Sequence, residues 1–156
     1  MKQGVIVTGA SSGIGLATVR LLAEKGYGVV GMARSKKPEV LEKYAQWGAV
    51  YSQGDVICAE DRARALKTAQ EAFGNVYALV NVAGVAPKVR ADILEMTEES
   101  YDTVMNINTK GMMFMTQLVA RAMLAQPRGE GLRGAIVNIS SMSAYTSSIS
   151  RGEYCI

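Results

Sequence analysis

One stretch near the start of the chain decides the fold: Thr8-Gly9-Ala10-Ser11-Ser12-Gly13-Ile14-Gly15. It follows a short apolar run at residues 5–7 and leads into an apolar helical pattern that stops at Gly26. We therefore predict a strand, a glycine-rich turn and a helix. Three apolar side chains are expected to share one face of that helix: Ile14, Ala17 and Leu21.

A turn of this kind directs backbone N–H groups and the positive end of a helix dipole to one point, where an anionic diphosphate can bind. Glycine is needed because a Cβ atom would block the approach. The spacing Gly9-x-x-x-Gly13-x-Gly15 differs from the G-x-G-x-x-G fingerprint and from the phosphate loop that ends in Gly-Lys-Ser/Thr. Because no lysine follows Gly15, the sequence argues against hydrolysis of nucleoside triphosphates. A tight strand-to-helix connection without a ligand is the weaker interpretation of three glycines and two serines at this turn.

The composition is that of a globular domain without histidine. The chain has 156 residues, of which 49% are hydrophobic and 20% charged, with a formal net charge of +3. These values predict one domain and do not indicate a nucleic-acid partner. We expect no membrane span and a cytoplasmic location, because the apolar runs are too short for a bilayer or a signal peptide. With no histidine and only Cys58 and Cys155, we predict no metal site and no histidine-dependent catalytic triad.

The rest of the chain alternates strands with helices. The predicted strands are 27–33, 49–53, 76–82 and 135–139, and the predicted helices are 38–47, 59–73 and a long one capped by Thr97. Residues 85–96 are irregular and are a place where a substrate could rest, and residues 127–134 form a basic, glycine-rich loop. Since parallel neighbours need crossover helices, the pattern predicts an α/β fold with a doubly wound parallel sheet of Rossmann type, in one domain over residues 1–156.

The glycine-rich turn and three later motifs resemble the short-chain dehydrogenase/reductase family. Members of this family carry Thr-Gly-x-x-x-Gly-x-Gly at the first turn, Asn-Asn-Ala-Gly after the fourth strand, Asn-x-x-Gly in the next helix, and a serine thirteen positions before a tyrosine. The matching residues here are Asn81-Val82-Ala83-Gly84, Asn108 with Gly111, and Ser141 with Tyr154. The valine at position 82 departs from the pattern. The spacing to Tyr154 selects Ser141 rather than Ser140.

The resemblance implies a dinucleotide cofactor held by the first half of the chain. It assigns twelve residues to cofactor binding: Gly9, Ser11, Ser12, Gly13, Ile14, Gly15, Arg34, Asp55, Val56, Asn81, Ala83 and Gly84. It also gives Asn81 the task of tying neighbouring strands together.

The end of the second predicted strand bears on the choice between NADP(H) and NAD(H). Arg34 suits a 2′-phosphate, and Ala33 stands where NAD-preferring members usually carry an acid, so NADP(H) is favoured over NAD(H). A solvated basic turn is the alternative for Arg34. Asp55 and Val56 would flank the adenine, or Asp55 would merely end its strand.

The resemblance also assigns Asn108, Ser141 and Tyr154 to the interconversion of a ketone and a secondary alcohol. Asn108 would disturb its helix and hold a water, Ser141 would polarise the carbonyl oxygen, and Tyr154 would protonate it. A free tyrosine has a pKa of about 10 and needs a nearby cation to ionise near neutrality. In the family this cation is a lysine four residues later, which here would be position 158, and the sequence ends at Ile156. We therefore expect the N-terminal portion of such an enzyme, truncated after the fifth strand and inactive by itself.

The substrate and assembly are less closely defined by the sequence. A 3-oxoacyl thioester on a carrier protein, as in 3-oxoacyl-[acyl-carrier-protein] reductases, and a sugar or polyol ketone both remain open. A non-catalytic dinucleotide-binding module is an alternative of another class. Because the family commonly dimerises through helices of this region, we expect the full-length form to be a homo-oligomer, with the apolar residues 112–123 against a partner helix.

Overall fold

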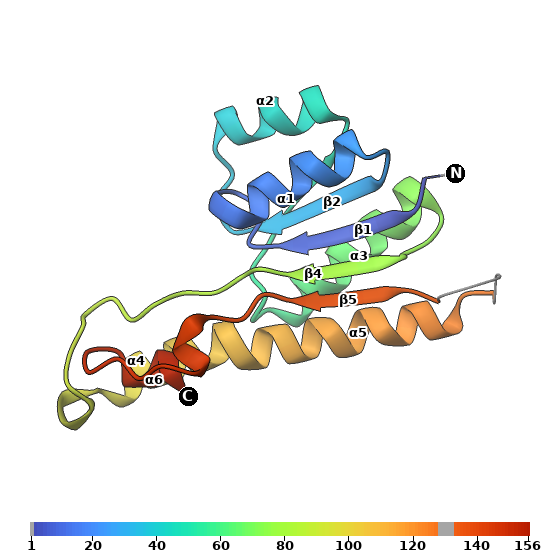
Figure 1. Cartoon of the computed structure of the whole chain (residues 1–156). Helices are drawn as coiled ribbons and strands as arrows, with labels where there is room; N and C mark the ends of the chain where they lie inside the picture. Colours follow the sequence, from blue (N-terminus) through green and yellow to red (C-terminus); the bar gives the residue numbers. More distant parts are fainter. Residues whose placement is uncertain (1, 128–132) are drawn as a thin grey trace.

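The computed structural model, which describes residues 2–127 and 133–156, has a parallel sheet between two layers of helices (Figure 1). The strands are β1 (Gly4–Thr8), β2 (Gly28–Ala33), β3 (Val50–Gln53), β4 (Ala78–Asn81) and β5 (Ala135–Asn138). All four pairings are parallel, in the order β3-β2-β1-β4-β5. The order reverses between β1 and β4, and such a switch opens a crevice at the carboxyl ends of the strands. The predicted Rossmann-type fold is confirmed.

Four long helices cover the two faces of the sheet. On one face lie α1 (Gly13–Glu24) and α2 (Pro38–Trp47), and on the other lie α3 (Ala59–Phe73) and α5 (Met112–Ala125). The bounds of α2 and α3 are those predicted. Of the predicted loop at 127–134, residues 128–132 lie outside the described residues.

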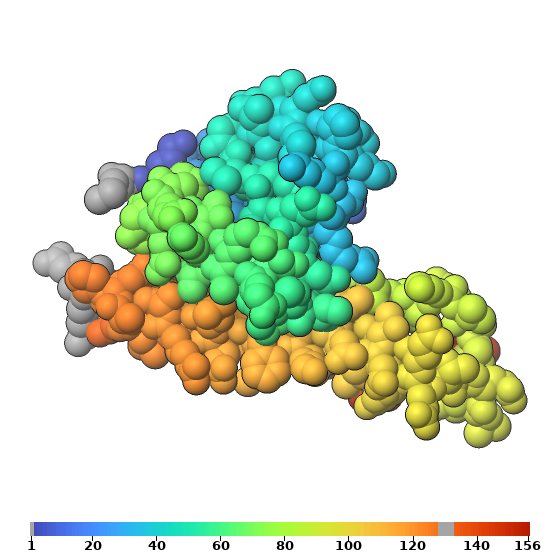
Figure 2. Space-filling view, turned by 180° about the vertical axis from the view of Figure 1, so that it is seen from behind, coloured from blue at the N-terminus to red at the C-terminus, as the bar shows by residue number. Residues whose placement is uncertain are grey.

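Short helices lie beyond the carboxyl ends of β4 and β5 (Figure 1). They are the 3₁₀ helices η1 (Ile93–Glu95) and η3 (Met142–Ala144), the helices α4 (Glu98–Met105) and α6 (Gly152–Cys155), and the π-helix η2 (Asn106–Gly111). Thr97 caps α4 as predicted, because its hydroxyl oxygen accepts the N–H of Ser100 at 3.2 Å. Figure 2 shows the segment around α4 projecting to one side of the sheet and its helices.

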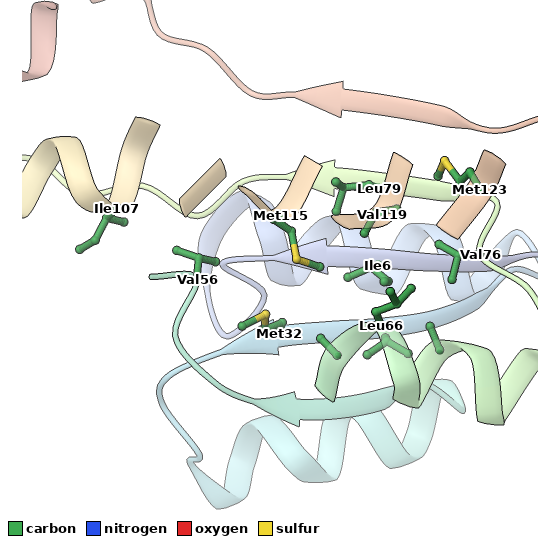
Figure 3. Packing of buried hydrophobic residues seen from close by; sticks show 13 residues of the cluster. Ile6, Met32, Val56, Leu66, Val76, Leu79, Ile107, Met115, Val119 and Met123 are labelled. Carbon is green, nitrogen blue, oxygen red and sulfur yellow. The ribbon is translucent and has the colours of Figure 1, made fainter. Parts of the chain in front are cut away.

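The larger of two hydrophobic clusters lies between the sheet, α3 and α5. Figure 3 shows Ile6 and Leu79 of the strands packed with Leu66 of α3 and with Met115 and Val119 of α5. The π-helix joins this cluster through Ile107, and its Gly111 packs against Val56, where a Cβ atom would lie 2.9 Å from a methyl group. A glycine is therefore required where η2 passes the end of β3.

The smaller cluster leaves the predicted apolar face of α1 outside the core. Ile14 is 61% exposed and Leu21 54% exposed, and Ala17 is also exposed, so their shared face does not point into the core. The buried side of α1 carries Gly15 and Val19 instead. Apolar residues surround most of α1, so the pattern alone did not select a face. The close approach at Gly15 selects it, because a Cβ atom there would lie 2.3 Å from the carbonyl oxygen of Gly9.

The outer strand β5 and the residue after it carry apolar side chains that remain partly accessible. Ile136 and Val137 of β5, and Ile139 directly after it, are each more than a third exposed. No helix within the described ranges has both the length and the apolar character that a bilayer crossing requires.

Candidate active site

A cleft of about 400 Å³ opens where β1, β2, β3 and β4 end. Every residue predicted to bind the cofactor lines this cleft except Asn81: Gly9, Ser11, Ser12, Gly13, Ile14, Gly15, Arg34, Asp55, Val56, Ala83 and Gly84. The structure therefore brings together residues that are up to 75 positions apart in the chain.

The glycine-rich turn forms the floor of the cleft. Gly9 and Gly13 have φ angles of +66° and +51°, in the left-handed region that favours glycine. A Cβ atom on Gly9 would lie 2.8 Å from the backbone of Ala83, whereas the space in front of Gly13 is open. Helix α1 then begins without a hydrogen bond from a capping side chain. Its first N–H groups and its positive dipole end can therefore serve an anion.

Thr8 joins the turn to the exit of β4, a role that the sequence analysis missed. Its buried hydroxyl oxygen accepts the N–H groups of Val82 and Ala83, each at 3.1 Å. These two bonds hold the chain after β4 against the glycine-rich turn. The only indication of this role in the sequence is the hydroxyl-bearing residue directly before Gly9.

The side chains at the ends of β2 and β3 supply the charges of the cleft. Arg34 is 63% exposed, and its Nη1 lies 3.9 Å from Oδ2 of Asp55. An exposed pair at this distance is weak, so the guanidinium remains able to bind an anion. Asp55 also shapes its own turn, because its Oδ1 accepts the N–H of Ile57 at 3.2 Å.

Asp61 of α3 supports the same turn from behind. Its Oδ2 accepts the N–H of Asp55 at 2.7 Å, and its Oδ1 pairs with the guanidinium of Arg64. The hydrogen bond from Asp55 is the main cause that lowers the pKa of Asp61, with Arg64 acting in the same direction and burial opposing both. Asp61 is therefore a stable anion that fixes the backbone between Gly54 and Asp55.

The structure does not bring Asn81 to the cleft. Its side chain is buried, and Nδ2 donates to Oδ1 of Asn138 at 2.9 Å and to Oγ1 of Thr116 at 3.0 Å. These contacts join β4 to β5 and to α5. This position agrees with the strand-tying task of Asn81. The side chain does not line the cleft, so it is not placed to contact a cofactor there.

Asn108 lies in the π-helix beside the cleft. Its Nδ2 donates to the carbonyl oxygen of Val85 at 2.9 Å, and its Oδ1 accepts the N–H of Val85 at 2.8 Å. The pair of bonds fixes the chain after Gly84, where Val85 and Ile107 both line the cleft. π-Helical turns are frequent at functional sites, and this one places the asparagine that the sequence singled out.

Ser141 and Tyr154 lie beyond the end of β5. The hydroxyl oxygen of Ser141 accepts the N–H of Ser143 at 3.2 Å and caps η3. Tyr154 is half-buried in α6, with the guanidinium carbon of Arg151 5.4 Å from its ring centre. Helix α6 contacts η3 and α4. Asn108, Ser141 and Tyr154 thus lie on segments at the same end of the sheet, and none of them lines the cleft itself.

Comparison with known protein families shows to which family this chain belongs. The family model described as short chain dehydrogenase matches residues 3–155. The chain belongs to the short-chain dehydrogenase family. This result confirms the resemblance that the glycine-rich turn and the later motifs indicated.

Individual members of the short-chain dehydrogenase family are about a third identical to this chain over the aligned residues. The 2-dehydro-3-deoxy-D-gluconate 5-dehydrogenase of Dickeya dadantii is 34% identical over 151 residues, which are 96% of this chain and 57% of that protein. The 3-hydroxyacyl-CoA dehydrogenase type-2 of Drosophila melanogaster is 35% identical over 156 residues, which are 96% of this chain and 61% of that protein.

A solved structure shows the same fold. The 3-oxoacyl-[acyl-carrier protein] reductase from Brucella melitensis, in complex with NAD, has a TM-score of 0.89 at 32% identity, over 99% of this chain and 62% of that chain. The present chain therefore spans less than two thirds of the length of each of these three relatives.

Proposed function

We propose that this chain binds a nicotinamide dinucleotide in the cleft, with NADP(H) preferred over NAD(H). The observation that carries the proposal is the open, uncapped start of α1 at Gly13, with Arg34 on the same cleft. The diphosphate would lie on the backbone N–H groups of the turn, and Arg34 would pair with a 2′-phosphate. Family membership and the NAD complex of the Brucella melitensis relative support a cofactor of this class.

We further propose that the full-length protein is an oxidoreductase that interconverts a ketone and a secondary alcohol. The bound cofactor supplies or accepts the hydride. Ser141 binds the carbonyl oxygen through its O–H, which donates no hydrogen bond within the described residues, while its Oγ accepts the N–H of Ser143. Tyr154 transfers the proton to or from that oxygen, and Asn108 holds the backbone of Val85 next to the cleft.

Two substrate classes fit this proposal. The Drosophila melanogaster relative is named for an acyl thioester and the Dickeya dadantii relative for a sugar acid. In this chain, residues from 87–97, α4 and α6 line a cavity of about 260 Å³, whose apolar lining includes Val89, Met96 and Val104. This cavity has room for part of a 3-oxoacyl chain or a sugar ketone.

A non-catalytic dinucleotide-binding module is the second candidate. It is favoured by one observation: neither Ser141 nor Tyr154 lines the cleft.

We also propose a cytoplasmic protein whose full-length form is a homo-oligomer. The exposed apolar side chains Met113, Phe114 and Leu124 of α5 would be the contact surface between copies.

Calorimetric titration with NADPH and NADH tests the cofactor assignment directly. We expect binding of both, with NADPH the tighter, and absence of binding would overturn the proposed function. In the full-length protein, cofactor oxidation with a 3-oxoacyl thioester or a sugar ketone separates the enzyme from the binding module. Binding without any turnover would favour the module.

A further inference from the structure

A buried tyrosine contacts the glycine-rich turn from behind. Tyr44 of α2 is only 2% exposed, and its hydroxyl donates to the carbonyl oxygen of Ala10 at 2.7 Å. Gly31 of β2 makes this contact possible, since a Cβ atom at that position would lie 1.8 Å from the tyrosine oxygen. Ala10 is also fixed by its N–H, which donates to the carbonyl oxygen of Met32 at 3.2 Å. The middle of the turn is therefore held on both sides.

A second tyrosine holds the other backbone segment of the cleft. The hydroxyl of Tyr51, on β3, reaches the carbonyl oxygens of Ser35 and of Ala33, the latter at 3.3 Å. The intervening carbonyl oxygen, that of Arg34, accepts from Nε2 of Gln53 at 3.1 Å. Side chains of β3 thus contact the carbonyl oxygens of Ala33, Arg34 and Ser35, with the single hydroxyl hydrogen of Tyr51 shared between the first and the last. These contacts fix the backbone of the residue whose guanidinium is proposed to pair with a 2′-phosphate.

The two tyrosines contact each other. Their rings meet edge to face, with centroids 5.0 Å apart and an interplanar angle of 87°, a favourable aromatic geometry. Burial raises the pKa of Tyr44, with Tyr51 adding to the shift, and burial also raises the pKa of Tyr51. Both hydroxyls therefore keep their protons at neutral pH and act as donors.

We propose that Tyr44 and Tyr51 are positioning residues, each for a different part of the cofactor cleft. Tyr44 holds the turn that contacts the diphosphate, and Tyr51 holds the turn whose Arg34 side chain contacts the 2′-phosphate. This inference rests on the cofactor site proposed above and extends it. Selectivity for a 2′-phosphate then depends on the tyrosine that fixes the backbone of Arg34 as well as on Arg34 itself. A pair of tyrosines that only filled the core would affect folding stability without distinguishing one nucleotide from another.

The test uses two small nucleotides and three single-atom variants. Calorimetry measures the affinity of the purified chain for ADP, which carries the 5′-diphosphate alone, and for adenosine 2′,5′-bisphosphate. The variants are Tyr44→Phe, Tyr51→Phe and the matched control Tyr77→Phe, whose ring stacks on Tyr27 instead. Each substitution removes one hydroxyl and keeps the ring, and circular dichroism confirms that each variant is folded.

We expect Tyr51→Phe to weaken the 2′,5′-bisphosphate by about twofold to tenfold, the range that one net hydrogen bond covers, with little change for ADP. Tyr44→Phe should weaken both nucleotides by the same factor and leave their ratio unchanged, and Tyr77→Phe should change neither. Equal losses for the two nucleotides in Tyr51→Phe, or no loss in either tyrosine variant, would overturn the positioning role and leave the cofactor site intact. Failure of the unsubstituted chain to bind either nucleotide would overturn the cofactor site and the positioning role together.

Discussion

Replacing Asn108 by alanine removes both hydrogen bonds between the π-helix and the backbone of Val85. A net intramolecular hydrogen bond contributes about 0.5–1.5 kcal/mol, so two half-buried bonds contribute about 1–3 kcal/mol to the free energy of unfolding. In a chain of this size each kcal/mol shifts Tm by roughly 2–4 °C, so we expect Asn108→Ala to lower Tm by about 2–12 °C in a thermal unfolding experiment.

Asn106→Ala is the matched control for this prediction. Asn106 lies in the same π-helix, and its side chain makes no hydrogen bond within the described part of the chain. Both substitutions gain the same helix propensity, since alanine is a better helix former than asparagine. The difference between the two Tm values therefore isolates the contacts with Val85, and equal values would refute the reasoning.

Four further outcomes are expected. Arg34→Ala should reduce the ratio of NADPH to NADH affinity by about tenfold, the lower end for a charged hydrogen bond, and an unchanged ratio would argue against its contact with a 2′-phosphate. In an active full-length form, Ser141→Ala should lower ketone reduction by roughly 10², while Ser140→Ala does much less; similar effects would mean that the wrong serine was selected. Residues 1–156 alone should bind cofactor without reducing a ketone, and turnover equal to that of the full-length protein would contradict this. Because the folded-state pKa of Asp61 is lowered, its carboxylate stabilises the fold above the ordinary aspartate pKa of about 3.9, and this contribution is lost as the pH falls through the folded-state value. The stability difference between the unsubstituted chain and Asp61→Asn should therefore shrink in acid urea titrations, and a constant difference would contradict the assignment.

The sequence predicted the helices whose ends are marked by proline and glycine. Helix α2 begins at Pro38, and Gly48 and Gly74 follow α2 and α3 with φ angles of +62° and +74°. A proline suits the first turn and a glycine in the left-handed region ends a helix, so these bounds depend on local chemistry alone.

The bounds of β4 depended on a distant side chain. The prediction covered 76–82, but the strand occupies Ala78–Asn81. Val76 donates its N–H to Oε1 of Gln126 at 2.6 Å and accepts from Nε2 of that residue at 3.0 Å. Its backbone groups are thus satisfied by a side chain of the segment after α5, which no local pattern could reveal.

Most residues of the candidate site were found because they follow strands. Parallel strands bring their carboxyl ends to one edge, so the glycine-rich turn, Arg34, Asp55 and Gly84 could be grouped from the sequence. Asn81 also ends β4, but its side chain bonds to Asn138 and Thr116 and does not line the cleft.

The sequence did not indicate Tyr44 and Tyr51, because they do not line the cleft and instead contact backbone carbonyl groups of the segments that do. The hydrogen bond from Tyr44 to Ala10 spans 34 residues, and aromatic residues at such positions normally indicate only a core. A glycine at position 31, inside a buried strand, was the available signal, since such a glycine often marks a close approach by another group.

A crystal structure of the chain with NADPH tests the central proposal most directly. We predict that the diphosphate lies within hydrogen-bond distance of backbone N–H groups between Ser12 and Gly15, with the 2′-phosphate beside the guanidinium of Arg34. A dinucleotide bound away from the start of α1, or with its 2′-phosphate remote from Arg34, would contradict the account.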